Sequence, residues 1–377
     1  MEKVKDNIAP RAEGIILFPQ PGKGVVNGKQ IHRTFPVNPT RPITAWGLIG
    51  AGIRAYDHMD GVGNRYGVHT VILEVDGEEV FRSVVDRFAY EENRYINSWT
   101  HGQYMKSFIE PGNRLRMLHA SNGNRGLVEI NEERPYRFVY TLSDALGNTS
   151  KVRFTVQGKN TEIHPVEHRE KYAFKWDRTN YLQEPGLELV VPRGMLYDDV
   201  WLDYSVRADS GDVAFTYQLH NKRVPLHGAC EMRIGLRRDR LEDKSKYYVA
   251  GVTARGGKYS IGGTYEDGFM KVRIRDLGTY TVAVDTVPPE IIPLNPGQWG
   301  RTGRITLKAK DKETGINSYR GTIDGKYALF GKPNSISGNL VCELDPKHVK
   351  KGGRHTVEMT VTDGRGNRTT EEFHFVW

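Results

Sequence analysis

The sequence has few cysteines and no long apolar run, and both shortages limit what the chain can be. Its 377 residues include two cysteines, Cys230 and Cys342, which could form one disulfide or remain as two buried free thiols. No apolar stretch reaches the roughly 18 residues needed to cross a bilayer, so we expect no transmembrane segment. The charged start MEKVKDNIAP has no apolar core, so we expect no signal peptide on this chain.

Signatures of catalysis are also missing. The sequence contains neither the G-x-S-x-G turn that presents a nucleophilic serine nor the phosphate-binding motif G-x-x-x-x-G-K. Neither cysteine lies in a reactive motif. His164 and His168 have the spacing of a helical metal pair, but Pro165 between them blocks the helix. We therefore predict no catalytic residue and no cofactor from these motifs.

The charge balance is basic, with 54 Lys and Arg against 46 Asp and Glu and a net charge of +8. Such a charge favours an anionic partner, such as nucleic acid, anionic lipid or an acidic wall polymer. The basic residues are spread evenly, and the densest cluster, RIGLRRDR (233–240), accompanies no nucleic-acid-binding motif. We therefore expect no nucleic-acid partner.

What the chain does contain is a repeat. At this length two or three domains are expected, and 41 Gly and 18 Pro suit many short strands joined by tight turns. Four landmarks occur twice in the same order, so the first and last thirds are the same kind of unit. The paired landmarks are DNIAP (6–10) and DTVPP (285–289), IRAYD (53–57) and LKAKD (307–311), VDG (75–77) and IDG (323–325), and DALGN (144–148) and DGRGN (363–367).

The landmarks are typical of β-structure. In TVILEVDGEEVF (70–81), apolar residues alternate around an Asp-Gly turn, which predicts a hairpin. The D-x-x-G-N phrase is followed by alternating apolar residues and predicts the last hairpin of an immunoglobulin-like sandwich. We predict an all-β chain of three tandem β-sandwich domains: 1–158 (Ig-like, enlarged by loops at 57–66 and 86–125), 159–284 (a different type) and 285–377 (Ig-like).

Two loops of the first domain are candidate binding sites. Asp57, Asp60 and Asn64 lie in a glycine-rich loop and could bind calcium, although Met59 stands where a helix–loop–helix calcium loop would place a ligand, and a solvated loop is the simpler interpretation. The loop 97–108 carries Trp99, His101 and Tyr104, which could contact a glycan or a partner if they face outward. Should the chain be an enzyme with an unrecognised metal site, Asp57, Asp60, His58 and His101 are its most plausible members.

Part of the sequence resembles a known family. The resemblance lies in PQPGKGVVNGKQ (19–30), AWGLIGAGIRAYDHMDG (45–61), YGVHTVILEVDGEEVF (66–81) and YMKSFIEPGNRL (104–115). These stretches resemble the region that follows the catalytic domain in exported lysostaphin-like (LytM-type) zinc metallopeptidases of Gram-negative bacteria. The resemblance implies β-sandwich modules behind a peptidase domain that cuts peptidoglycan cross-bridges, and a location in the periplasm or cell envelope.

The zinc ligands of that family, an H-x-x-x-D pair and a later H-x-H, are missing here. The fourth residue after His32 is Pro36, and the fourth after His69 is Leu73. The resemblance thus implies a non-catalytic accessory region without zinc of its own, which positions a catalytic peptidase domain in cis or binds peptidoglycan or an envelope protein. A glycan- or protein-binding, adhesin-like module is the first alternative, and the enzyme with an unrecognised site is the second.

Overall fold

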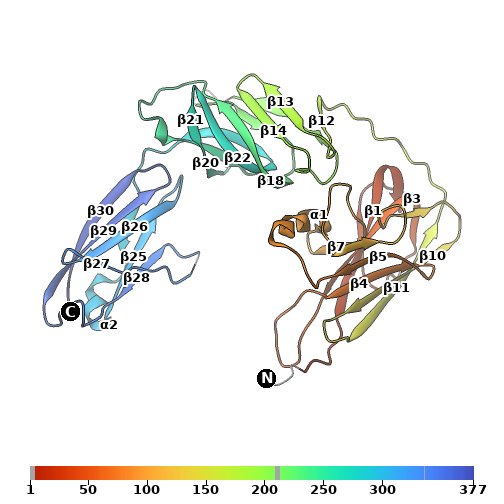
Figure 1. Cartoon of the computed structure of the whole chain (residues 1–377), viewed down its shortest axis with the longest axis horizontal. Helices are drawn as coiled ribbons and strands as arrows, with labels where there is room; N and C mark the ends of the chain where they lie inside the picture. Colours follow the sequence, from red (N-terminus) through yellow and green to blue (C-terminus); the bar gives the residue numbers. More distant parts are fainter. Residues whose placement is uncertain (1–4, 209–212, 335) are drawn as a thin grey trace. The chain divides into compact units, whose positions relative to one another are not determined.

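The computed structural model describes residues 5–208, 213–334 and 336–377. Strands run along the whole ribbon, and the helices are short (Figure 1). The prediction of an all-β chain of tandem Ig-like β-sandwich domains is confirmed. Among the described residues, no helix is long and apolar enough to cross a membrane.

Contacts divide the chain into two compact units. The first comprises Met1–Arg178 with Arg193–Trp201, and the second comprises Thr179–Pro192 with Leu202–Trp377. The three predicted domain ranges remain predictions.

The first unit is built on one 11-stranded sheet, whose main path runs from β2 to β8. In order along that path the strands are β2 (Arg33–Phe35), β1 (Arg11–Val26), β3 (Ile43–Tyr56), β11 (Thr149–Gly158), β10 (Pro135–Ser143), β4 (Thr70–Val75), β5 (Glu78–Val84) and β8 (Leu118–Ala120). Off the path are β6 (Thr100–His101), β7 (Tyr104–Lys106) and β9 (Val128–Ile130), and the preceding loop carries η1 (Tyr90–Tyr95) and α1 (Ile96–Trp99).

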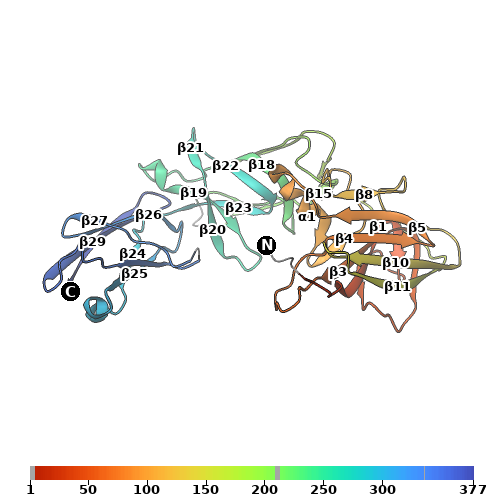
Figure 2. The ribbon, with the colours of Figure 1, turned by 60° about the horizontal axis from the view of Figure 1, so that its bottom comes forward.

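Side-chain alternation explains how this sheet encloses a core. In β10 every second residue is buried, and β10 pairs along its whole length with β11, beside which it lies in Figure 2. The register of β1 against β3 shifts twice, and such irregularities bend a strand so that a long sheet can fold over itself. The enclosed apolar side chains include Ile15, Leu17, Ile53, Leu73, Phe138, Tyr140 and Val156.

The enlarged loop of the first unit has a structural partner. The Gly112 amide donates to the carbonyl oxygen of Tyr197 at 2.7 Å, and the Tyr197 hydroxyl donates to the carbonyl oxygen of Arg94 at 2.6 Å. Residues 193–201 are therefore held against the loop 86–125. A short sheet of β12 (Tyr172–Phe174) and β15 (Val200–Leu202) adjoins this segment.

The second unit begins with a pair of five-stranded sheets. One sheet contains β13 (Asn180–Glu184), β14 (Leu187–Val191), β18 (Val224–Gly235), β22 (Phe269–Leu277) and β21 (Thr264–Glu266). The other contains β16 (Ser205–Arg207), β17 (Thr216–Gln218), β23 (Thr279–Val284), β19 (Tyr247–Val252) and β20 (Lys258–Gly262), with η2 (Lys244–Lys246) before β19.

The C-terminal part of the second unit is a smaller sandwich of three and four strands. Its sheets are β24 (Glu290–Pro293), β25 (Arg304–Lys310) and β28 (Asn339–Glu343), and β27 (Lys326–Ala328), β26 (Ile316–Ile323), β29 (Arg354–Asp363) and β30 (Arg368–Val376). The short helices η3 (Pro296–Gln298) and α2 (Trp299–Thr302) precede β25. Its core contains Trp299, Leu307, Val357 and Met359.

The predicted Asp-Gly hairpins are present in both copies of the repeat. Asp76 and Gly77 join β4 to β5 with φ of 54° and 92°, and Asp324 and Gly325 join β26 to β27 with φ of 51° and 75°. Positive φ at both central residues is the type I′ arrangement, whose twist matches that of paired strands. The closing phrase likewise connects β10 to β11 and β29 to β30.

Both cysteines are free and buried. Burial raises the pKa of each thiol to about 11, with a further upward contribution at Cys342 from the charge of Glu343. The sequence leaves open one disulfide or two free thiols, and in the structure Cys230 and Cys342 are free thiols.

Candidate functional site

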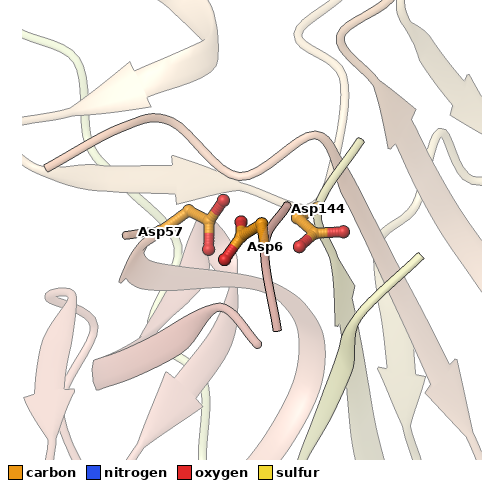
Figure 3. A group of neighbouring side chains, drawn as sticks. All are labelled: Asp6, Asp57 and Asp144. Atoms are coloured by element: carbon orange, nitrogen blue, oxygen red, sulfur yellow. The ribbon is translucent and has the colours of Figure 1, made fainter. Parts of the chain in front are cut away.

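The landmarks of the first repeat bring three aspartates together. Asp57 follows the end of β3, Asp144 follows the end of β10, and Asp6 lies in the chain that leads into β1. One carboxylate oxygen of each residue lies within 4.8 Å of the others, as the close-up in Figure 3 illustrates. Three segments far apart in the sequence thus present carboxylates to one point beside the ends of β3 and β10.

Asp144 is held in place by its own turn. Its Oδ1 atom accepts hydrogen bonds from the amides of Leu146 and Asn148, both at 2.8 Å, and its Oδ2 atom accepts one from Asn148 Nδ2 at 2.6 Å. Burial raises the pKa of this carboxyl, but the hydrogen bonds from Asn148 and the turn outweigh burial and hold the pKa below its usual range. Asn148 also donates to the carbonyl oxygen of Asp6 at 3.0 Å, which ties the N-terminal segment to the turn.

Asp57 lies in a different environment. Only 7% of the residue is exposed, and its backbone exchanges two 2.9 Å hydrogen bonds with Tyr66. Its Oδ1 atom is buried and accepts no hydrogen bond from any residue that the structure describes. Burial raises the pKa of Asp57 above its usual value, and the nearby charges of Asp144 and Asp6 add to the rise against a lowering hydrogen bond from the His58 backbone.

A second group of three aspartates occupies the same repeat positions near the C-terminus. Asp285, Asp311 and Asp363 bring one oxygen each within 4.8 Å of one another. Asn367 Nδ2 donates to the carbonyl oxygen of Asp285 at 3.0 Å and to Asp363 Oδ2 at 2.7 Å, as Asn148 does in the first copy. The repeated phrase therefore builds the same arrangement twice.

The two groups differ in how the middle aspartate is satisfied. Asp311 Oδ1 accepts hydrogen bonds from the amides of Glu313, Thr314 and Gly315 at 3.1, 2.8 and 2.6 Å. The Thr314 hydroxyl donates to Asp285 Oδ2 at 2.6 Å. The loop after β25 thus supplies donors to its aspartates, whereas the loop after β3 leaves Asp57 Oδ1 without one.

Of the residues predicted for a calcium loop, the three-carboxylate group includes only Asp57. Asp60 accepts a 3.0 Å hydrogen bond from Asn7, and the Asn64 carbonyl oxygen bonds His58 Nδ1 at 2.8 Å. Sequence reasoning missed Asp6 and Asp144 as partners of Asp57. The signal was available, because all four repeated landmarks contain an aspartate at matching places, and three of these aspartates in each copy form the group.

The residues predicted for glycan contact lie in different environments. Trp99 is 6% exposed and packs in the core, with its indole nitrogen donating to the Lys106 carbonyl oxygen at 3.1 Å. His101 is exposed and stacks edge-on against His32, with ring centroids 4.6 Å apart. Tyr104 is half-buried under the guanidinium of Arg54. The structure therefore does not bring the three rings onto one exposed face.

The comparisons with known proteins give one family match. The family model of a Zu5-like domain matches residues 171–285, which is a minority of the chain. No curated protein matches the sequence.

Several solved structures resemble the chain weakly. A structure of SGBP-B from the Bacteroides ovatus mixed-linkage glucan utilization locus, in complex with a mixed-linkage heptasaccharide, has 10% identity and a TM-score of 0.15, with 99% of this chain and 71% of that one covered. A Ca²⁺-stabilized adhesin that helps an Antarctic bacterium bind ice has 11% identity and a TM-score of 0.17, with 99% and 90% covered. The structure of protocadherin gamma B2 extracellular cadherin domains 3–6 has 12% identity and a TM-score of 0.20, with 99% of this chain and 78% of that one covered. At these scores the likenesses carry no inference about function.

Proposed function

We propose that this chain is a non-catalytic β-sandwich region of a cell-envelope protein that holds attached domains at a fixed separation. In this proposal the protein it serves is a lysostaphin-like zinc metallopeptidase, with its catalytic domain in cis and peptidoglycan or an envelope protein as the contact. The four stretches of the first domain that resemble this family support the assignment. The net charge of +8 suits an acidic envelope.

The observation that carries the spacer role is the junction inside the second unit. Arg365, in the repeated phrase of the C-terminal sandwich, donates through one guanidinium nitrogen to the carbonyl oxygens of Tyr247 and Gly263 at 2.9 and 3.0 Å. Lys246 Nζ donates back to the Arg365 carbonyl oxygen at 3.0 Å, and the Asp285 amide donates to the Lys246 carbonyl oxygen at 2.9 Å. Hydrogen bonds in both directions across a junction oppose bending between the two sandwiches.

A further contact strengthens the same junction. The Tyr248 hydroxyl donates to Glu313 at 2.8 Å, so the loop after β25 also reaches the five-stranded sheets. Hydrogen bonds that involve a charged group contribute about 1.5–3 kcal/mol each, and several of them act together here. Independent motion of the two sandwiches requires all of these bonds to break.

The experiment that tests this proposal measures a distance across the junction in the full chain. Spin labels are attached to cysteines introduced at Tyr181 and Tyr327, which are 64% and 63% exposed in the two sandwiches. The native thiols of Cys230 and Cys342 are buried and stay unlabelled because burial raises their pKa. We expect a narrow distance distribution from double electron–electron resonance.

The Arg365→Ala variant is expected to broaden that distribution at least twofold, because it removes two of the bonds that cross the junction. Leu146→Ala is the matched control, since Leu146 occupies the equivalent place in the first copy of the phrase and is 57% exposed. A broad distribution in the unmodified chain would contradict a fixed spacer.

A further inference from the structure

We propose that Asp6, Asp57 and Asp144 form a binding site for one divalent hard cation of the calcium type. This site goes beyond the spacer role, because it lies in the first unit and makes no use of the junction around Arg365.

Asp57 has a buried carboxylate oxygen that accepts no hydrogen bond from the described residues. Buried polar atoms in folded proteins nearly always have a partner, and a buried acceptor without one costs about 1–3 kcal/mol. Asp57 Oδ1 is such an atom, and the residue that carries it is 93% buried and belongs to the group of three carboxylates that converge within 4.8 Å. A cation at the centre of the three carboxylates supplies the missing partner.

The C-terminal copy of the repeat satisfies the equivalent aspartate in another way. There the loop amides of Glu313, Thr314 and Gly315 donate to Asp311, so that aspartate is satisfied by the chain itself. The first copy keeps the three aspartates but replaces that loop by a longer one, residues 58–66, which bonds Asp57 through its backbone instead. Among these six aspartates, a buried carboxylate oxygen without a hydrogen-bond partner therefore occurs in the first copy and not in the second.

The ligand chemistry decides the class of cation. The three converging groups are carboxylates, without an imidazole or thiolate among them, and such oxygen ligands select calcium or magnesium rather than zinc or copper. Calcium accepts irregular geometry and completes six to eight ligands with water, whereas magnesium demands a near-octahedral site. Three carboxylates from three separate segments match calcium, with Kd on the order of 10⁻⁴–10⁻³ M as in extracellular modules.

Binding would fix the chain that precedes β1. Asp6 lies before that strand, while Asp57 and Asp144 follow the ends of β3 and β10. A cation therefore joins the N-terminal segment to two strand ends and offsets the repulsion among three like charges. Because only the folded first unit assembles the three ligands, calcium stabilises that unit by mass action.

The test uses the full chain, freed of metal with a chelator and titrated with calcium chloride. Equilibrium dialysis should give one bound ion per chain, and thermal unfolding at calcium tenfold above Kd should shift up by roughly 3–6 °C. Asp57→Asn and Asp6→Asn should each weaken binding at least tenfold. Two variants are used so that a folding defect in one leaves the site testable through the other.

Asp311→Asn is the matched control in the C-terminal copy and should leave calcium binding unchanged. Without calcium, Asp57→Asn should be as stable as the unmodified chain or more stable, because the substitution removes one of three repelling charges. With calcium, the unmodified chain should instead be more stable than Asp57→Asn. A purely structural role of Asp57 would not produce this reversal.

Three outcomes would overturn the proposal. One is the absence of binding by the unmodified chain at about 10 mM calcium, well above the expected Kd. Another is binding that survives in both Asp57→Asn and Asp6→Asn. The third is binding that is lost in Asp311→Asn alone, which would place the ion in the C-terminal copy.

Discussion

At the scale of single residues, aspartate has two separate roles in the repeated domains. Asp76 and Asp324 adopt positive φ in the hairpin turns, which Asp tolerates better than most residues. Asp6, Asp57 and Asp144 instead converge on one point from three segments. The turn role was predictable from the Asp-Gly dipeptide, because it depends on local conformation. The convergence depends on which strand ends meet, and no local pattern in the loop at 57–64 indicates it.

The turn aspartate of the C-terminal sandwich gives a prediction for pH dependence. Asp324 Oδ2 accepts a 2.7 Å hydrogen bond from His355, which is 6% exposed, and Oδ1 accepts one from the Thr356 amide at 3.0 Å. The hydrogen bond from His355 and that from Thr356 hold the pKa of Asp324 below its usual range. A lowered folded-state pKa gives stability that is present above the unfolded value of about 3.9 and lost as pH falls through the folded pKa.

We therefore expect Asp324→Asn to lower the free energy of unfolding by about 1 kcal/mol at pH 6, a modest figure because the Asp324 side chain is half exposed. The difference should shrink below pH 4. Asp267→Asn is the control, since Asp267 has the same positive φ in a hairpin without a histidine partner among the described residues. Urea unfolding at several pH values measures the effect, and a constant difference down to pH 2.5 would contradict it.

At the scale of elements, the hairpins were predictable and the docked loop was not. The strands on either side of each Asp-Gly or D-x-x-G-N turn alternate buried and exposed residues, so their pairing follows from adjacent sequence. The loop 86–125 was expected as an enlargement of the first domain, but its contact with residues 193–201 joins segments that share no pattern. Only the folded chain brings Gly112 against Tyr197.

The backbone of Gly112 lies so close to residues 196 and 197 that a side chain at this position should be destabilising. A Cβ atom added at Gly112 would lie 2.3 Å from the Leu196 carbonyl oxygen and 2.8 Å from Tyr197 Cα. Gly112→Ala should therefore displace residues 193–201 at a cost of roughly 1–3 kcal/mol, as overpacking does elsewhere. Hydrogen exchange should rise in that segment and stay low in β10 and β11. Gly123→Ala is the control because a Cβ there meets nothing within 4 Å, and equal exchange in both variants would refute the expectation.

At the scale of the whole molecule, the sequence repeat identified related first and last domains, and both copies contain the aspartate group and the paired hairpins. The contacts between the C-terminal sandwich and the five-stranded sheets were not predictable. They depend on Arg365, whose equivalent in the first copy of the repeat is Leu146. The two copies share the same turn, and the sequence of the turn alone does not indicate which distant residues the Arg365 side chain will contact.

The net charge of +8 is spread along the chain rather than concentrated in one cluster. If the chain works beside an acidic wall polymer, it should sediment with isolated peptidoglycan sacculi at low salt. It should be released at about 1 M salt, where the Debye length falls to about 3 Å. Two double variants test the role of charge, and each lowers the net charge by four at exposed positions of a different sandwich. They are Lys151→Glu/Arg153→Glu and Lys310→Glu/Lys326→Glu.

Because the attraction is summed over the molecule, both pairs should weaken retention to a similar extent. Retention that is lost with one pair and kept with the other would instead mark a local binding surface on that sandwich. If neither salt nor charge reversal changes the amount of protein that sediments with the sacculi, an electrostatic contact with the wall is contradicted. Calcium must be held constant throughout, because an ion bound at Asp6, Asp57 and Asp144 would itself add two positive charges to the first unit.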